Sequence, residues 1–114
     1  MNIYFVRHGF ALHNLEAIIN GDSAYNDPNN IDSPLLEEGI QQAKEANKYI
    51  NKIKFDKIFS SPLIRCIQTT ENILSNNGNT VFLADILMEP QGYHICNKRK
   101  DLGELTKFCE KLNN

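Results

Sequence analysis

The chain has 114 residues, of which 41% are hydrophobic and 23% are charged, and its formal net charge is −2. A chain of this length forms one domain around one core, and the composition is typical of a globular protein. The slightly negative charge argues against a protein that binds nucleic acid, and no apolar stretch reaches the length of a membrane span.

The N-terminal half predicts a strand, a short helix, a loop and a long helix. The apolar run 3–6 predicts a buried strand, and residues 11–19 predict one or two helical turns. Residues 21–34 are rich in Asn, Asp, Ser and Pro and predict a loop, which is long enough to suggest a functional role. From about Leu35, apolar residues recur at three-to-four residue spacing and predict a helix.

The C-terminal half continues the alternation of strands and helices. Strands are predicted at 55–59 and 80–84, and helices at 63–74 and 102–112. Strands that alternate with helices imply right-handed crossovers. The predicted fold class is therefore α/β, a parallel sheet with helices on both faces in a three-layer arrangement.

Cysteine and histidine usage indicates neither a disulfide framework nor a metal site. The three cysteines include no CxxC pair, and the three histidines do not have metal-ligand spacing. We predict no cofactor, and we interpret His13 as an ordinary loop histidine. Because the first predicted strand begins at Ile3, there is no room for a signal peptide, and a cytoplasmic location is expected.

Polar groups follow each of the three predicted strands. Arg7 and His8 come directly after the first strand, and Glu89 follows the third. Arg65 comes after the second strand, in the first turn of a helix that Ser61 is placed to cap. Because the carboxyl ends of parallel strands meet at one edge of a sheet, we expect these groups to lie close together.

These groups are the ones that phosphoryl transfer through a covalent intermediate requires. Guanidinium groups match the oxygens of a phosphoryl group in transit, and the helix that begins near Arg65 favours an anion at its N-terminus. Two nearby guanidiniums favour a neutral, nucleophilic imidazole at His8. Glu89 can give a proton to the leaving oxygen and later take one from water.

The same residues resemble the motifs of a known family. Arg7, His8 and Gly9, followed by Asn14, are similar to the opening motif of the histidine phosphatase superfamily, which includes the cofactor-dependent phosphoglycerate mutases. Three further blocks resemble family motifs in the same order: 32–39 (DSPLLEEG), 60–70 (SSPLIRCIQTT) and 87–89 (LME). Four blocks in the right order over about 90 residues form a specific signal.

The resemblance implies hydrolysis of a phosphomonoester, either a phosphorylated small molecule or a phosphoprotein, through a phosphohistidine. It makes His8 the phosphorylated nucleophile and Glu89 the proton donor. The implied phosphate ligands are Arg7, Asn14 and Arg65, and the basic pair placed to contact an anionic part of the substrate is Lys98 and Arg99.

Three positions depart from the family pattern without touching the proposed chemistry. Phe10 stands where a polar residue is commoner, and Cys66 replaces an alanine. Leu36 replaces the usual threonine, so the helix that follows is expected to lose a hydroxyl cap worth ~1 kcal/mol.

A second histidine, which the family places late in the chain after a further strand, has no counterpart here. We therefore expect a single domain, 1–114, without the family's C-terminal segment, either as a fragment or as a complete short protein. His94 lacks the glycine-flanked strand that a substitute would need. In the family the missing strand lies beside the first one, so residues 3–6 would form an open edge that favours self-association.

The sequence leaves three functions open. Phosphatase activity is favoured over phosphoglycerate mutase-type transfer, because a mutase needs a second phosphate-bearing substrate site that the sequence does not indicate. The absent second histidine also allows a catalytically inactive module that binds phosphate or a partner. A protein phosphate on His8 would separate the enzyme from the module.

Overall fold

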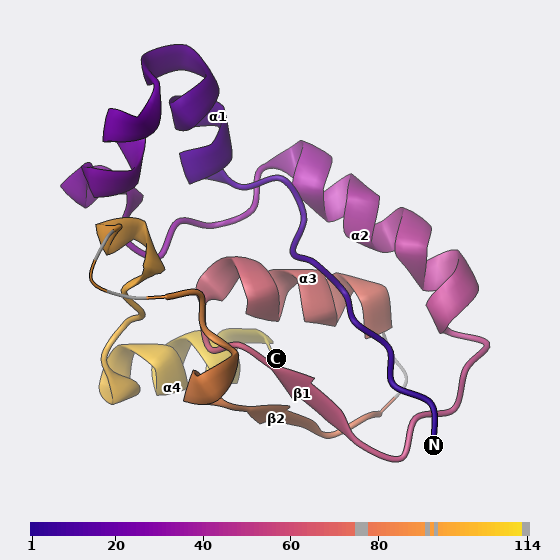
Figure 1. The fold of residues 1–114 in the computed structure, drawn as a ribbon. Helices are drawn as coiled ribbons and strands as arrows, with labels where there is room; N and C mark the ends of the chain where they lie inside the picture. Colours follow the sequence, from indigo (N-terminus) through magenta and orange to yellow (C-terminus); the bar gives the residue numbers. More distant parts are fainter. Residues whose placement is uncertain (75–77, 91, 93, 113–114) are drawn as a thin grey trace.

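The computed structural model describes residues 1–74, 78–90, 92 and 94–112. Within these residues, helices and two short strands alternate along the chain as predicted (Figure 1). The strands are β1 (Ile58–Ser60) and β2 (Val81–Leu83), the α-helices are α1 (Leu12–Asn20), α2 (Glu37–Ile50), α3 (Ile64–Leu74) and α4 (Leu102–Leu112), and the 3-10 turns are η1 (Asp22–Asn26), η2 (Pro28–Asn30), η3 (Asp85–Leu87) and η4 (Ile95–Asn97).

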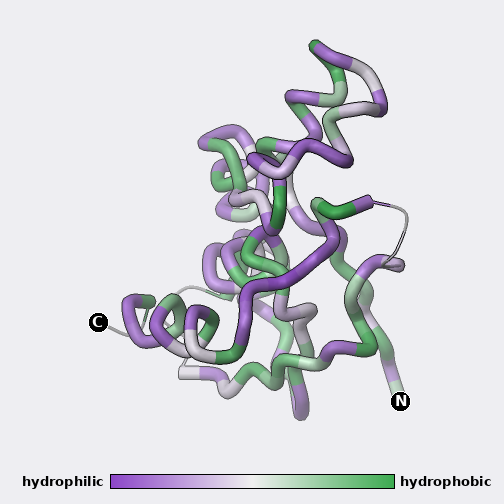
Figure 2. Tube along the Cα trace, turned by 90° about the vertical axis from the view of Figure 1, so that its left-hand side faces the viewer, coloured by the Kyte–Doolittle hydropathy of each residue, from purple (hydrophilic) through white to green (hydrophobic). Residues whose placement is uncertain are grey.

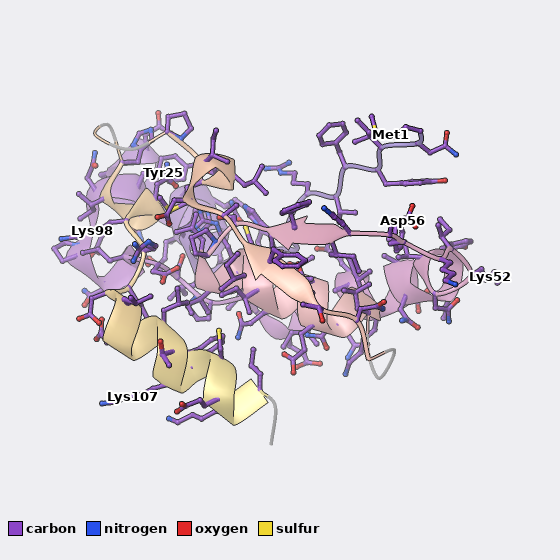
Figure 3. The ribbon with its side chains drawn as sticks, turned by 90° about the horizontal axis from the view of Figure 1, so that it is seen from below. Met1, Tyr25, Lys52, Asp56, Lys98 and Lys107 are labelled. Carbon is purple, nitrogen blue, oxygen red and sulfur yellow. The ribbon has the colours of Figure 1, made fainter. Side chains whose placement is uncertain are left out.

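The two strands form a parallel sheet, which confirms the predicted topology. Phe59 of β1 lies opposite Phe82 of β2, and α3 packs against β1 on one side of the sheet. On the other side the two phenylalanine rings lie 5.6 Å apart and are half exposed, with the strands in front of α3 when seen from below (Figure 3). Among the described residues, α3 is thus the helix that packs against β1.

Residues 3–6 do not form the predicted strand. The segment is extended, but the described residues include no strand that pairs with it, and Phe5 is 93% exposed. Tyr4 packs edge-on against Phe55, with ring centroids 5.6 Å apart. Figure 2 shows this hydrophobic stretch running from the N-terminus. The apolar pattern indicated burial, but a strand also needs a hydrogen-bonding partner. Self-association through this segment stays a prediction.

The main apolar cluster lies between α3 and α4. Its buried members are Ile64 and Ile67 of α3 and Leu105 of α4, and the partly buried side chains of α4 that pack against them are Phe108, Cys109 and Leu112. Both helices lie where the sequence predicted them. None of the described helices is long and apolar enough to cross a membrane. The cytoplasmic location stays a prediction.

A close backbone crossing places the Arg-His-Gly triplet against the start of α2. A Cβ atom on Gly9 would lie 2.5 Å from the carbonyl oxygen of Gly39, so only glycine fits there. Two hydrogen bonds secure the crossing: the Phe10 amide donates to Gln42 Oε1 at 2.9 Å, and the Leu36 amide donates to the Phe10 carbonyl at 3.0 Å. As expected from its leucine, α2 begins at Leu36 without a side-chain cap.

Asp32 links its own loop to the start of α3 and to the segment before α4, and no sequence pattern predicted these contacts. It is buried, with a left-handed φ of 49°. Its Oδ1 accepts a hydrogen bond from the Ile64 amide at 2.7 Å, at the start of α3, and its Oδ2 accepts one from the Lys100 amide at 3.1 Å. The predicted cap, Ser61, accepts only a longer 3.3 Å bond from Leu63. Asp32 is therefore the stronger cap of α3.

Candidate active site

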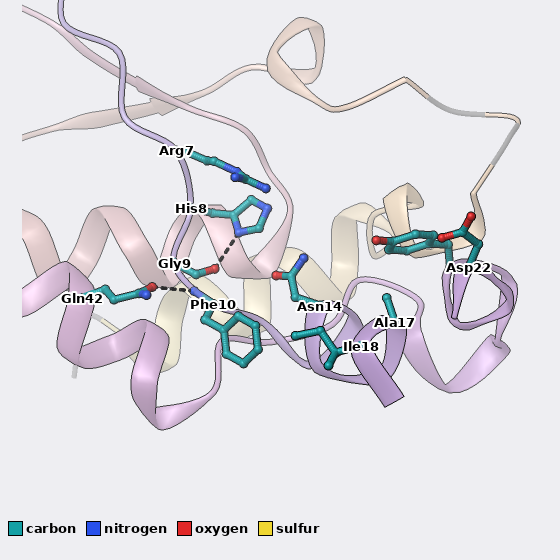
Figure 4. Close-up of a pocket in the computed structure, with 10 residues that line it drawn as sticks. Arg7, His8, Gly9, Phe10, Asn14, Ala17, Ile18, Asp22 and Gln42 are labelled. Carbon is teal, nitrogen blue, oxygen red and sulfur yellow. Dashed lines mark hydrogen bonds between the residues drawn. The ribbon is translucent and has the colours of Figure 1, made fainter. Parts of the chain in front are cut away.

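A cavity of about 440 Å³ opens where the N-terminal segment meets α1 and η1 (Figure 4). Arg7 and His8 line it, and Figure 4 shows both side chains extending to the same side of the backbone. The other lining residues are Gly9, Phe10, Asn14, Ala17, Ile18, Asp22, Tyr25 and Gln42. The cavity therefore contains the basic start of the predicted site.

The imidazole of His8 is oriented by its own backbone neighbour. Its Nδ1 lies 2.7 Å from the Gly9 carbonyl oxygen, and its side chain is 7% exposed. A carbonyl oxygen can only accept, so Nδ1 carries the hydrogen of this bond. The Gly9 amide in turn donates to Thr69 Oγ1 at 3.0 Å, which fixes the triplet to α3. The nitrogen that faces the site is therefore Nε2.

The side chains of His8 and Arg65 both contact one carboxylate oxygen of Glu89. Glu89 Oε1 lies 3.4 Å from His8 Nε2 and 3.4 Å from Arg65 Nη2. These residues come from the N-terminal segment, from α3 and from the loop after η3. They lie close together as expected, although the first of the three predicted strands does not form. The neutral state expected for His8 stays a prediction.

The two partners of Glu89 keep its carboxylate ionised. A hydrogen bond from His8 and the charge of Arg65 lower the pKa of Glu89 to about 2, although partial burial acts in the opposite direction. At neutral pH this carboxylate therefore carries no proton in the ligand-free site. Glu89 must gain a proton before it can act as the predicted acid.

Arg65 is held rigidly beneath the site. Its side chain is fully buried, and its Nη1 and Nη2 donate to the Cys96 carbonyl at 3.2 Å and to Asn97 Oδ1 at 2.9 Å. Asn97 is fixed in turn by a 3.0 Å bond to the Pro90 carbonyl. Sequence reasoning missed Cys96 and Asn97, because a backbone carbonyl and a side-chain amide in a short 3-10 turn give no sequence pattern that marks them.

Asn14, a predicted phosphate ligand, is engaged locally. Its Oδ1 accepts from the Ala11 amide at 3.0 Å, so the side chain caps α1. Its Nδ2 lies 3.3 Å from His13 Nε2. The residue lines the cavity, and the second hydrogen of its Nδ2 is not used by the contact with His13. Its role as a ligand stays a prediction.

The structure does not bring the basic pair Lys98 and Arg99 to the cavity. Neither residue lines it. Arg99 Nε lies 2.8 Å from Asp85 Oδ1, and its Nη1 donates to the Lys100 carbonyl at 2.8 Å, so its charge is already matched. Lys98 and Arg99 follow the block that contains Glu89 in the sequence, but they do not line the same cavity as His8. Their contact with a substrate stays a prediction.

His13 is a helical residue of the core, so its interpretation as a loop histidine was wrong. It lies in α1, is 4% exposed, and its Nδ1 lies 2.8 Å from Ser33 Oγ. Its ring centroid is 5.8 Å from that of His8. Burial and the nearby charge of Arg65 lower the pKa of His13 to about 4. It is thus a neutral neighbour of the site, and no sequence spacing revealed it.

His13 is expected to make the protein sensitive to mild acid. Its pKa is 6.5 in the unfolded chain and about 4 in the folded one, so the unfolded state binds the proton first as the pH falls. The free energy of unfolding should decrease by about 3 kcal/mol across this range, at about 1.4 kcal/mol per pKa unit.

Urea unfolding at a series of pH values measures this decrease. His13→Gln should unfold with a free energy that changes little between pH 6.5 and about 4, whereas His94→Gln should keep the decrease of the natural chain. An equal decrease in His13→Gln and in the natural chain would show that another group is responsible.

The sequence is similar to a family model and to known proteins. A family model described as the histidine phosphatase superfamily (branch 1) matches residues 3–98. The chain is 35% identical to fructose-2,6-bisphosphatase TIGAR B of Danio rerio, over 82% of this chain and 35% of that protein. It is 33% identical to the 2,3-bisphosphoglycerate-dependent phosphoglycerate mutase of Methanococcus vannielii, over 72% of this chain and 32% of that protein. The chain spans about a third of the length of these relatives.

Solved structures share the same fold. A structure from Escherichia coli, described as an alpha-ribazole-5'-P phosphatase, matches with a TM-score of 0.62 and 21% identity, over 92% of this chain and 52% of that one. Phosphoserine phosphatase of Entamoeba histolytica, solved with 3-phosphoglyceric acid, matches with a TM-score of 0.56 and 33% identity, over 88% of this chain and 44% of that one. These matches confirm the predicted fold class.

Proposed function

Because the chain belongs to the histidine phosphatase superfamily, we propose that it hydrolyses phosphomonoesters through a phosphohistidine on His8. The observation that supports this proposal most directly is that His8 and Arg65 contact the same oxygen. Both reach the same Glu89 oxygen at 3.4 Å, so an anionic oxygen at that place meets a nucleophilic nitrogen and a buried guanidinium together. Phosphoryl transfer requires this combination.

A bound phosphate would take over contacts that Glu89 makes in the ligand-free site. One phosphoryl oxygen would accept from Arg65 Nη2, and Arg7, which lines the cavity beside His8, would contact a second. The N-terminus of α3 adds a favourable potential for the anion. The phosphate would lie with its phosphorus facing His8 Nε2, which is the nitrogen that Gly9 leaves unbonded.

The pair of His8 and Glu89 also suggests how the proton moves. Because Nδ1 already carries one hydrogen, a second hydrogen on Nε2 makes the ring a cation. A dianion bound beside the Glu89 carboxylate raises the proton affinity of that carboxylate, so this second hydrogen passes from Nε2 to Glu89 and leaves the imidazole neutral. This frees the lone pair on Nε2. As Nε2 bonds to phosphorus and the ester P–O bond breaks, Glu89 gives that proton to the leaving oxygen. Water then attacks the phosphorus of the phosphohistidine and gives a proton to Glu89, while the P–Nε2 bond breaks, its electron pair returns to the imidazole, and inorganic phosphate leaves.

Transfer to water rather than to a second phosphorylated molecule is the simpler reading of this site. The cavity beside His8 contains Arg7 as its only lysine or arginine among the residues that line it. The similarity to a phosphoglycerate mutase of Methanococcus vannielii is the observation that favours mutase-type transfer as the second candidate. The two differ in whether the phosphoryl group is recovered as inorganic phosphate or on an acceptor.

Rapid quenching of the chain with a radiolabelled phosphomonoester tests the proposal. We expect a labelled protein phosphate that is labile in acid and stable in alkali, followed by release of inorganic phosphate, with the label on the peptide that contains His8. Recovery of the label on added 3-phosphoglyceric acid would favour the mutase. Reversible phosphate binding without a protein phosphate would show an inactive binding module and refute the proposal.

A further inference from the structure

The part of the cavity beyond His8 is apolar with one acidic side chain. Phe10, Ala17, Ile18 and Tyr25 supply aliphatic and aromatic surface, and Asp22 lies on the far side from Arg7 (Figure 4). Asp22 and Tyr25 both belong to η1 and both line the cavity. The organic part of a phosphomonoester whose phosphate meets His8 would extend over this surface.

The charge of Asp22 is not matched by a nearby cation. Its carboxylate forms no hydrogen bond or ion pair with any residue in the described ranges, and the side chain is exposed to the cavity. This contrasts with Asp85, which is paired with Arg99, and with Glu89, which is paired with Arg65. A ligand in the cavity would therefore meet the full negative charge of Asp22.

The cavity also lacks the cations that would hold a second phosphate. Among the lining residues, Arg7 is the only lysine or arginine, and it lies beside His8. The amide oxygen of Gln42 is occupied by the Phe10 backbone. A second phosphate at the far end would thus face Asp22, and like charges at short range repel each other.

We infer that this site selects phosphomonoesters that carry one phosphate on a neutral or cationic body, and that Asp22 excludes molecules with a second phosphate. The inference rests on the proposed function, since it assumes that the first phosphate binds at His8. It distinguishes this chain from relatives whose names specify bisphosphates. Asp22 acts here by contact with the ligand, through charge rather than shape.

A matched pair of substrates tests the inference: n-butyl phosphate and butanediol bisphosphate, which differ only in the second phosphate. We expect the natural chain to prefer the monophosphate by about tenfold or more in kcat/KM, a difference typical of one unfavourable charge contact. Asp22→Lys should remove or reverse the preference. Phosphocholine, with a cationic body, should be used better by the natural chain than by this variant.

Asp56→Lys is the control, because it makes the same change of charge at an exposed position at the other end of the molecule from Tyr25 (Figure 3). It should keep the preference of the natural chain. Equal use of both substrates by the natural chain, or an unchanged ratio in Asp22→Lys, would overturn the inference.

Binding of the matching butyl phosphonate and butane bisphosphonate, which cannot be hydrolysed, provides the same comparison without turnover. If the chain forms no protein phosphate, the proposed function fails, and these two dissociation constants still decide the selectivity. Preference for the monophosphonate that Asp22→Lys abolishes would support the role of Asp22. Equal dissociation constants would refute it.

Discussion

Replacing His8 with asparagine is expected to abolish the protein phosphate and lower kcat by roughly a thousandfold or more, because removing a nucleophile has effects of this size. Asparagine is the informative substitution. Its Nδ2 can still donate to the Gly9 carbonyl, as His8 Nδ1 does at 2.7 Å, while nothing replaces Nε2. The variant thus keeps the local backbone geometry and loses only the reactive atom. Quenched labelling and steady-state hydrolysis measure the two effects.

The control for this experiment is His94→Asn, which makes the same substitution at a histidine that does not line the cavity. We expect it to keep the protein phosphate on His8. Thermal unfolding of both variants should show that they remain folded. A labelled protein phosphate that persists in His8→Asn would place the nucleophile elsewhere and end the proposed mechanism.

The site could be predicted because its parts are local motifs joined by a regular topology. Arg65 and Glu89 each follow a strand recognisable from sequence, and parallel pairing of β1 and β2 brings the segments after these strands to one edge. His8 reaches the same place through the bond of the Gly9 amide to Thr69 of α3. A short motif fixes which groups are present, and the crossover rule fixes where they meet.

The remaining features depend on contacts between distant segments. The apolar run 3–6 predicted a strand, but pairing depends on a neighbour that local pattern does not specify. His13 is buried, and its ring is bonded to Ser33, which lies twenty positions away in the sequence. Asp32 caps α3 across a similar separation, where sequence reasoning assigned the cap to the nearby Ser61.

These distant contacts explain why Arg65 is rigid. Its guanidinium is oriented by the backbone carbonyl of Cys96 and the side-chain oxygen of Asn97. The backbone amide of Asp32 donates to the same Cys96 carbonyl at 3.2 Å. Asp32 also caps the helix on which Arg65 lies. A donor fixed in this way needs little reorganisation when charge develops on a phosphoryl group, which is the condition for strong electrostatic catalysis.

Arg65→Lys is therefore expected to lower kcat/KM by about a hundredfold, with a parallel loss of affinity for inorganic phosphate. Removing a fixed donor typically costs ~3–4 kcal/mol of transition-state stabilisation, and lysine recovers part of it through its charge. A lysine ammonium cannot donate in the fixed fork that joins Cys96, Asn97 and the Glu89 oxygen. Steady-state kinetics and calorimetric phosphate binding measure the two losses.

Arg99→Lys makes the same substitution outside the cavity, where the guanidinium is partly exposed and paired with Asp85. Surface pairs of this kind contribute ~1 kcal/mol or less, so activity should stay close to that of the natural chain. Arg65 would be only a structural support if Arg65→Lys lowered the unfolding temperature and left both kcat/KM and phosphate affinity unchanged. Because Arg65 Nη2 and His8 Nε2 face one oxygen, we expect the loss of kcat/KM in Arg65→Lys to be larger than its loss of stability.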